Sequence, residues 1–70
     1  MFKRYDLDVY YSGIHLYSAS FSSINHLVKF ACGFDSKYCD IEAFDTVFEN
    51  TLPIYELMKE FRGDVNGIWS

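Results

Sequence analysis

The two histidines and two cysteines have the side chains with the widest range of possible reactions and ligands in this chain. Cys32 and Cys39 are separated by six residues, whereas two to four residues separate the cysteines of a typical zinc site. His15 and His26 lie far apart, and neither stands at a catalytic spacing from a serine or a cysteine. We therefore predict no metal site, no cofactor and no catalytic residues, and we do not expect this protein to be an enzyme.

Paired carboxylates form the second group of reactive side chains. Asp6 and Asp8 alternate along a predicted strand, so both point to one face, about 7 Å apart. Such a pair suits cation binding or glycoside hydrolysis, but a chain of 70 residues offers little room for a deep cleft. No phosphate-binding loop, dinucleotide-binding fingerprint or calcium loop accompanies the pair, and we interpret it as a solvated strand face.

Negative charge is concentrated in the middle of the chain. The formal net charge is −4 and the pI is about 4.8, which argues against direct binding to nucleic acid or to an anionic membrane. Between Asp35 and Glu60, seven acidic residues stand against two basic ones. A surface of this kind suits a protein partner that carries a basic, nucleic-acid-binding surface.

The candidate partner-binding residues combine this acidic segment with tyrosines and aspartates of the N-terminal strands. If residues 40–50 are helical, Glu42, Asp45 and Glu49 form an acidic stripe along that helix at i, i+3 and i+7. Exposed tyrosines supply the apolar anchors that binding surfaces use. The candidates are Asp6, Asp8, Tyr10, Tyr17, Asp40, Glu42, Asp45, Glu49, Glu56 and Glu60.

With these acidic positions, the chain resembles small phage-encoded inhibitors of the anti-CRISPR and anti-restriction type. The resemblance is one of class, and it rests on size and charge over the whole chain. It implies an inhibitor that occupies the nucleic-acid groove of a protein complex, in part by imitating a nucleic-acid backbone such as that of DNA.

Self-association is the alternative function. Aromatic residues make up 20% of the chain, which is more aromatic surface than a core of this size can enclose. The edge strands of a hairpin also pair readily with other strands. The alternative is therefore a structural or adaptor module that forms a homodimer through its hairpin edge and its aromatic surface.

The elements that position these residues begin with a hairpin. Residues 4–11 alternate between apolar and polar side chains, as a half-buried strand does. Ser12-Gly13 and the β-prone segment 14–17 then predict a tight two-residue turn and a second strand. A regular register places Leu16 on the apolar face and Tyr17 on the polar face.

Helical spacing of apolar residues predicts one helix over residues 23–32 and a second from Pro53 to Gly63. Residues 40–50 fit two patterns. As a helix they present one apolar and one acidic face, whereas as a strand they place Asp45 among the buried positions. We favour the helix.

The expected architecture is a single α+β domain over residues 1–70, with an N-terminal antiparallel β-hairpin packed against two or three α-helices. If residues 40–48 form a strand, the alternative is a three- or four-stranded sheet with two helices. A turn at residues 66 and 67 would let Ile68 and Trp69 fold back over the core. The chain shows neither a signal-peptide pattern nor a membrane span, so we expect a cytoplasmic protein with reduced cysteines.

Overall fold

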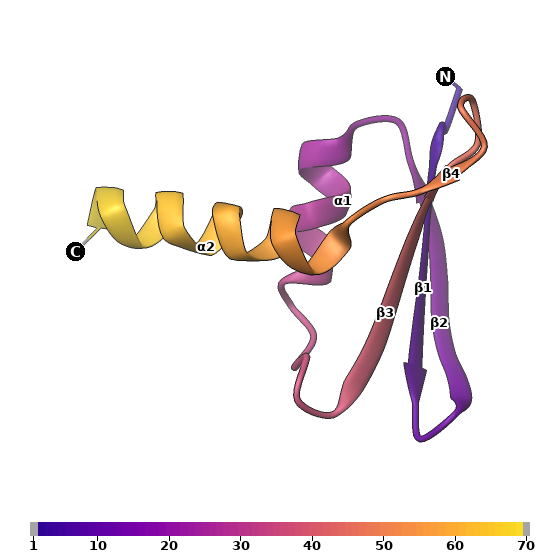
Figure 1. Cartoon of the computed structure of the whole chain (residues 1–70), viewed down its shortest axis with the longest axis horizontal. Helices are drawn as coiled ribbons and strands as arrows, with labels where there is room; N and C mark the ends of the chain where they lie inside the picture. The colour runs from indigo at the N-terminus through magenta and orange to yellow at the C-terminus, as the bar shows by residue number, and fades with distance from the viewer. Residues whose placement is uncertain (1, 70) are drawn as a thin grey trace.

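The computed structural model describes the backbone of residues 2–69 and the side chains of residues 2–63. Its strands form one antiparallel sheet in the order β2-β1-β3-β4, and its two helices lie on the same side of that sheet (Figure 1). The predicted α+β class is thus confirmed. The elements are β1 (Tyr5–Tyr11), β2 (Ile14–Phe21), α1 (Ile24–Ala31), β3 (Cys39–Asp45), β4 (Asn50–Thr51) and α2 (Ile54–Trp69).

The predicted hairpin is formed by β1 and β2. Ser12 and Gly13 connect the two strands with φ angles of 49° and 80°. Left-handed backbone at both central positions is what a type I′ turn requires, and glycine adopts it at little cost. The turn pairs Tyr11 with Ile14 and Tyr10 with His15, as the sequence predicts.

A β-bulge changes the register of β2 beyond the turn. Val9 pairs with Tyr17 instead of Leu16, so β2 contains one additional residue at this point. The predicted regular register is therefore wrong from Leu16 onwards. Tyr17 lies on the helix side of the sheet, where its ring packs against Phe30 with the ring centroids 5.3 Å apart.

The helix predicted over residues 40–50 is wrong, because β3 occupies most of this segment. β3 pairs with β1 along its whole length, and Ile41 and Ala43 enter the core. The strand also buries Asp45, which argues against a strand when the sequence is considered alone. Arg4 supplies the compensating charge, and the alternative of a four-stranded sheet with two helices is the observed one.

The two helices begin close to their predicted positions. The first lies within residues 23–32 and buries Leu27, Val28 and Ala31. The second begins directly after Pro53, whose fixed φ suits the start of a helix. It continues through Gly63 to Trp69, so the predicted end at Gly63 and the predicted turn at residues 66 and 67 are wrong. The side chains of Ile68 and Trp69 lie outside the described residues.

The hydrophobic core lies between the sheet and the helices. Among the described residues, no helix or strand covers the opposite face of the sheet (Figure 1). Neither helix, over the part of the chain that is described, is long and apolar enough to cross a membrane. The buried apolar side chains are Leu7, Val9, Leu27, Val28, Ala31, Ile41, Ala43, Ile54 and Met58.

Candidate functional site

The uncovered side of the sheet, called the open face below, collects acidic side chains from two neighbouring strands. Successive side chains of a strand point to opposite faces. The apolar residues of β1 and β3 point into the core, so the residues between them point outward. The open face therefore carries, on the two central strands, Asp6, Asp8, Tyr10, Asp40, Glu42 and Phe44.

Four of these side chains are carboxylates, and the register of β1 with β3 brings them together. Asp8 lies directly opposite Glu42, and Asp40 lies opposite Tyr10. Residues that face each other in an antiparallel pair have Cα atoms about 4.5–5.5 Å apart. We call Asp6, Asp8, Asp40 and Glu42 the acidic cluster.

Side chains of β2 orient the two aspartates of β1. The hydroxyl of Ser20 donates a hydrogen bond of 2.7 Å to Oδ1 of Asp6. Nε2 of His15 lies 3.2 Å from Oδ1 of Asp8, and the His15 ring lies against Tyr10 with the centroids 5.1 Å apart. These contacts hold the carboxylates in place on an exposed surface.

The acidic cluster borders a shallow hollow next to β4. Asp6, Asp8 and Glu42 line this hollow of about 330 Å³ together with Phe44 and Thr51. Phe44 is 38% exposed and gives the hollow an apolar wall. The arrangement offers negative charge around an apolar contact point, which suits a cationic side chain with an aliphatic stem, such as Lys or Arg.

Lysine and arginine are absent from the strands of the sheet. None of the six Lys and Arg residues lies within β1, β2, β3 or β4, the four strands of the described chain. Lys3 stands two residues before β1 and lines a second hollow, over β1 and β2, together with Asp6 and Asp8. The centre of the open face therefore has four carboxylates and no Lys or Arg of the strands, and His15 of β2 contacts one of the four, Asp8.

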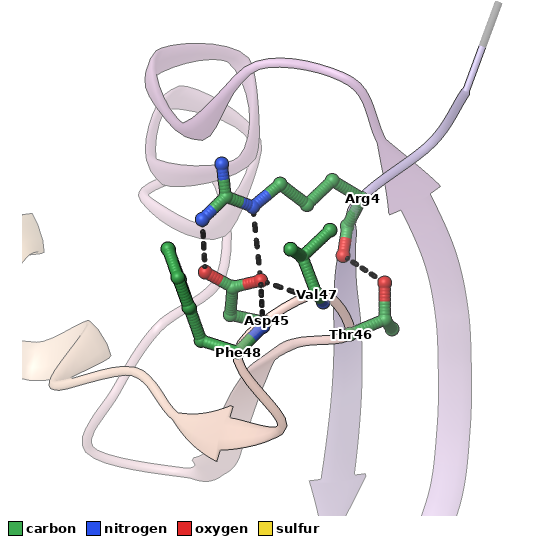
Figure 2. A network of polar contacts seen from close by, with 5 residues as sticks. All are labelled: Arg4, Asp45, Thr46, Val47 and Phe48. Atoms are coloured by element: carbon green, nitrogen blue, oxygen red, sulfur yellow. Dashed lines mark hydrogen bonds and ion pairs between the residues drawn. The ribbon is translucent and has the colours of Figure 1, made fainter.

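Asp45 is the one acidic residue of β3 that points to the other side, where it is 4% exposed (Figure 2). Its Oδ1 accepts a hydrogen bond from Nε of Arg4 at 2.9 Å, and its Oδ2 accepts one from Nη2 at 2.8 Å. Backbone N–H groups of Val47 and Phe48 also donate to Oδ1, at 2.9 and 3.3 Å. The hydrogen bonds from Arg4 are the main reason why the pKa of Asp45 falls to about 2.

The same ion pair fixes the turn that follows β3. The Thr46 hydroxyl donates a hydrogen bond of 2.6 Å to the carbonyl oxygen of Arg4 (Figure 2). The Arg4 guanidinium also lies 4.7 Å from the centre of the Phe48 ring. Asp45 is therefore committed to the fold, and the prediction that it belongs to a surface stripe is wrong.

The remaining predicted site residues are spread over the molecule. Glu49 is exposed in the turn before β4 with a φ of 53°, and Glu56 and Glu60 are exposed on α2. Tyr17 lies on the helix side of the sheet. The structure thus brings together Asp6, Asp8, Tyr10, Asp40 and Glu42, and it separates them from Asp45, Glu49, Glu56, Glu60 and Tyr17.

Sequence reasoning missed Phe44 as a member of this surface. A strand pattern over residues 39–45 would have placed Phe44 beside Asp40 and Glu42. The alternation in the hairpin predicts that His15 lies on the same polar face as Asp8 and Tyr10, but nothing in the sequence marks its contact with Asp8.

Over the described residues, no group of three or more His, Cys, Asp or Glu side chains has the geometry to hold a metal ion. Cys32 and Cys39 are both free thiols and partly buried. Comparison of the chain with protein-family models, with curated proteins and with solved structures gave no match.

Proposed function

We propose that this protein is a binding module that inhibits a nucleic-acid-handling protein complex by placing the open face of its sheet against a basic surface. The observation that carries the proposal is the acidic cluster, in which Asp8 faces Glu42 across two central strands with no Lys or Arg of the strands beside them. A groove that binds phosphates is lined with Lys and Arg and is complementary to such a surface.

Repulsion between the carboxylates of the acidic cluster favours binding to a basic partner. Like charges directly opposite each other in a sheet destabilise it by roughly 0.2–1 kcal/mol per pair. Basic side chains of a partner would neutralise that repulsion on binding, so the same carboxylates that weaken the isolated fold strengthen the complex. Their placement on two paired strands also sets the spacing of their backbone positions before binding, which limits the entropy lost in the complex.

Aromatic side chains at two ends of the cluster supply contact area. Tyr10 lies opposite Asp40, and Phe44 lies opposite Asp6. Partly exposed aromatic rings among polar groups are the usual anchors of protein interfaces. The open face thus combines charge for steering with two rings for contact.

The test is a pull-down of the tagged chain from lysate of its host, at low and at high salt. The variant Asp8→Asn/Glu42→Gln removes two charges from the open face, and Glu56→Gln/Glu60→Gln removes two charges from α2 as a matched control. We expect the wild type and the α2 variant to retain a basic nucleic-acid-handling protein, and high salt or added duplex DNA to release it.

The open-face variant should lose that protein while keeping its circular dichroism spectrum. Retention by the open-face variant and loss by the α2 variant would contradict the proposal, because the binding charges would then lie on the helix.

A further inference from the structure

The two outer edges of the sheet differ in how far other parts of the chain cover them. On the β3 side, β4 pairs with the end of the strand, and the Leu52 N–H donates to the Ala43 carbonyl at 2.8 Å. The Ile41 N–H donates to the hydroxyl of Tyr55 at 2.9 Å, so α2 covers part of the same edge. On the other side, β2 pairs only with β1, and no other strand within residues 2–69 adjoins it.

The free edge of β2 lacks most features that keep sheet edges from pairing. Edge strands are usually short, or carry charged residues or proline. β2 has eight residues and contains no Asp, Glu, Lys, Arg or Pro. Its bulge lies near the hairpin turn and leaves Tyr17–Phe21 in regular one-to-one pairing with β1. In a chain of net charge −4, a strand without carboxylates lets two copies approach at this edge.

An aromatic cluster borders this edge on the helix side of the sheet. The Phe30 ring of α1 lies 5.3 Å from Tyr17, 5.5 Å from Phe21 and 5.6 Å from Phe34, measured between ring centroids. Tyr17 is 44% exposed and Phe30 is 37% exposed. Phe21, Phe30 and Phe34 also line a shallow hollow of about 510 Å³. Exposed aromatic rings beside a free sheet edge offer apolar contact area to a second chain.

We infer that two copies of this chain associate through antiparallel pairing of Tyr17–Phe21, which joins their sheets into one sheet of eight strands. A two-fold axis perpendicular to the sheet at Ala19 places Tyr17 opposite Phe21 of the second copy and Ser18 opposite Ser20 of the second copy. The segment is therefore self-complementary, since aromatic meets aromatic on one face and serine meets serine on the other, as a two-fold interface requires.

The position of α1 fits this arrangement. α1 packs on both β1 and β2, so it lies above the space between them. Neighbouring strands are about 4.8 Å apart, and in the joined sheet α1 and its counterpart are separated by two strand spacings, or about 10 Å. Packed helices lie about 8–10 Å apart. The two helices therefore meet at contact distance, with Phe30 and Tyr17 of each copy at the seam.

The dimer leaves the acidic cluster free. The cluster lies on the opposite side of the sheet, so the two open faces form one surface, with β1 and its counterpart about 14 Å apart. Dimer formation and binding through the open face therefore use different residues, and either can be shown without the other.

The test is sedimentation equilibrium of the full chain over a wide concentration range, with Tyr17→Lys compared with Tyr38→Lys. Tyr38 is 66% exposed in the loop before β3, so its substitution makes the same change of charge away from the edge. We expect twice the chain mass of 8.2 kDa for the wild type and for the control at high concentration. Tyr17→Lys should weaken the dimer at least tenfold, because two cations would be buried at the seam.

Amide hydrogen exchange of the wild type locates the interface without a substitution. Amides of β2 that point away from β1 should exchange more slowly as the concentration rises, while amides of the Ser36–Tyr38 loop should not change. A wild type that stays monomeric at all concentrations overturns the inference. It does so even if the edge of β2 binds a peptide strand of another protein. A dimer whose β2 amides remain unprotected overturns it as well.

Discussion

Arg4 and Asp45, 41 residues apart in the sequence, form a two-point ion pair that closes one end of the sheet, with N–O distances of 2.9 and 2.8 Å (Figure 2). Replacing Asp45 by Asn removes the charge and leaves the guanidinium without its partner. We expect a clear fall in melting temperature, measured by circular dichroism. Asp40→Asn makes the same change at an exposed position of the same strand and should not lower the melting temperature.

The ion pair also predicts a pH dependence. Because Arg4 lowers the pKa of Asp45 from 3.8 to about 2, the unfolded state takes up the proton first as the pH falls. The contribution of Asp45 to stability is therefore complete above a pH of about 4 and is lost as the pH falls through about 2. The difference in melting temperature between wild type and Asp45→Asn should shrink over this range, and a difference independent of pH would contradict the assignment.

The same residues explain why β3 was misassigned. Ile41, Phe44, Val47 and Phe48 recur at helical spacing, and the strand pattern requires a buried Asp45. A local pattern cannot show that Arg4 reaches this carboxylate, because the contact depends on pairing between β1 and β3. The hairpin turn and the starts of both helices, in contrast, follow from local signals such as Ser12-Gly13 and Pro53, and they could be predicted.

The candidate site was predictable to a similar degree. Asp6, Asp8 and Tyr10 follow from the alternation in β1, but their neighbours on β3 follow only from its register with β1. The position of Tyr17 depends on the bulge. The phase of the alternation changes between Leu16 and Tyr17, since Tyr17, Ala19 and Phe21 alternate with serines, and this change is the one sequence signal for the bulge.

Two leucines of the hairpin allow the stability contribution of a buried side chain to be compared with that of an exposed one. Leu7 is 0% exposed between the sheet and the helices, whereas Leu16 in the bulge is 53% exposed. We expect Leu7→Ala to lower the free energy of unfolding by about 2–5 kcal/mol, which can abolish folding in a chain this small. Leu16→Ala should cost no more than about 0.5 kcal/mol in urea denaturation. Equal losses of unfolding free energy for the two variants would contradict the assignment of Leu7 to the core and Leu16 to the surface.

Tyr55 links α2 to the edge of β3 through one hydrogen bond. Its hydroxyl accepts the Ile41 N–H at 2.9 Å, at a point that β4 does not reach. Tyr55→Phe keeps the ring and leaves this N–H without an acceptor, so we expect a loss of about 0.5–1.5 kcal/mol in the free energy of unfolding. The Ile41 amide should also exchange faster with solvent. Tyr38→Phe, which removes a hydroxyl from an exposed loop residue, is the control and should change neither value.

The acidic cluster should lower the stability of the isolated fold, because the proposed binding function keeps carboxylates close together. Glu42 faces Asp8 directly across β3 and β1, and no Lys or Arg of the strands lies between the two carboxylates. Glu42→Gln keeps the size of the side chain and removes the repulsion, so we expect the free energy of unfolding to rise by about 0.2–1 kcal/mol at low salt. The gain should shrink as salt screens the charges. If the cluster binds a basic surface, the same variant binds its partner more weakly while being more stable, and these opposite directions distinguish a binding residue from a structural one. A Glu42→Gln protein that is less stable than the wild type would show that the carboxylates support the fold.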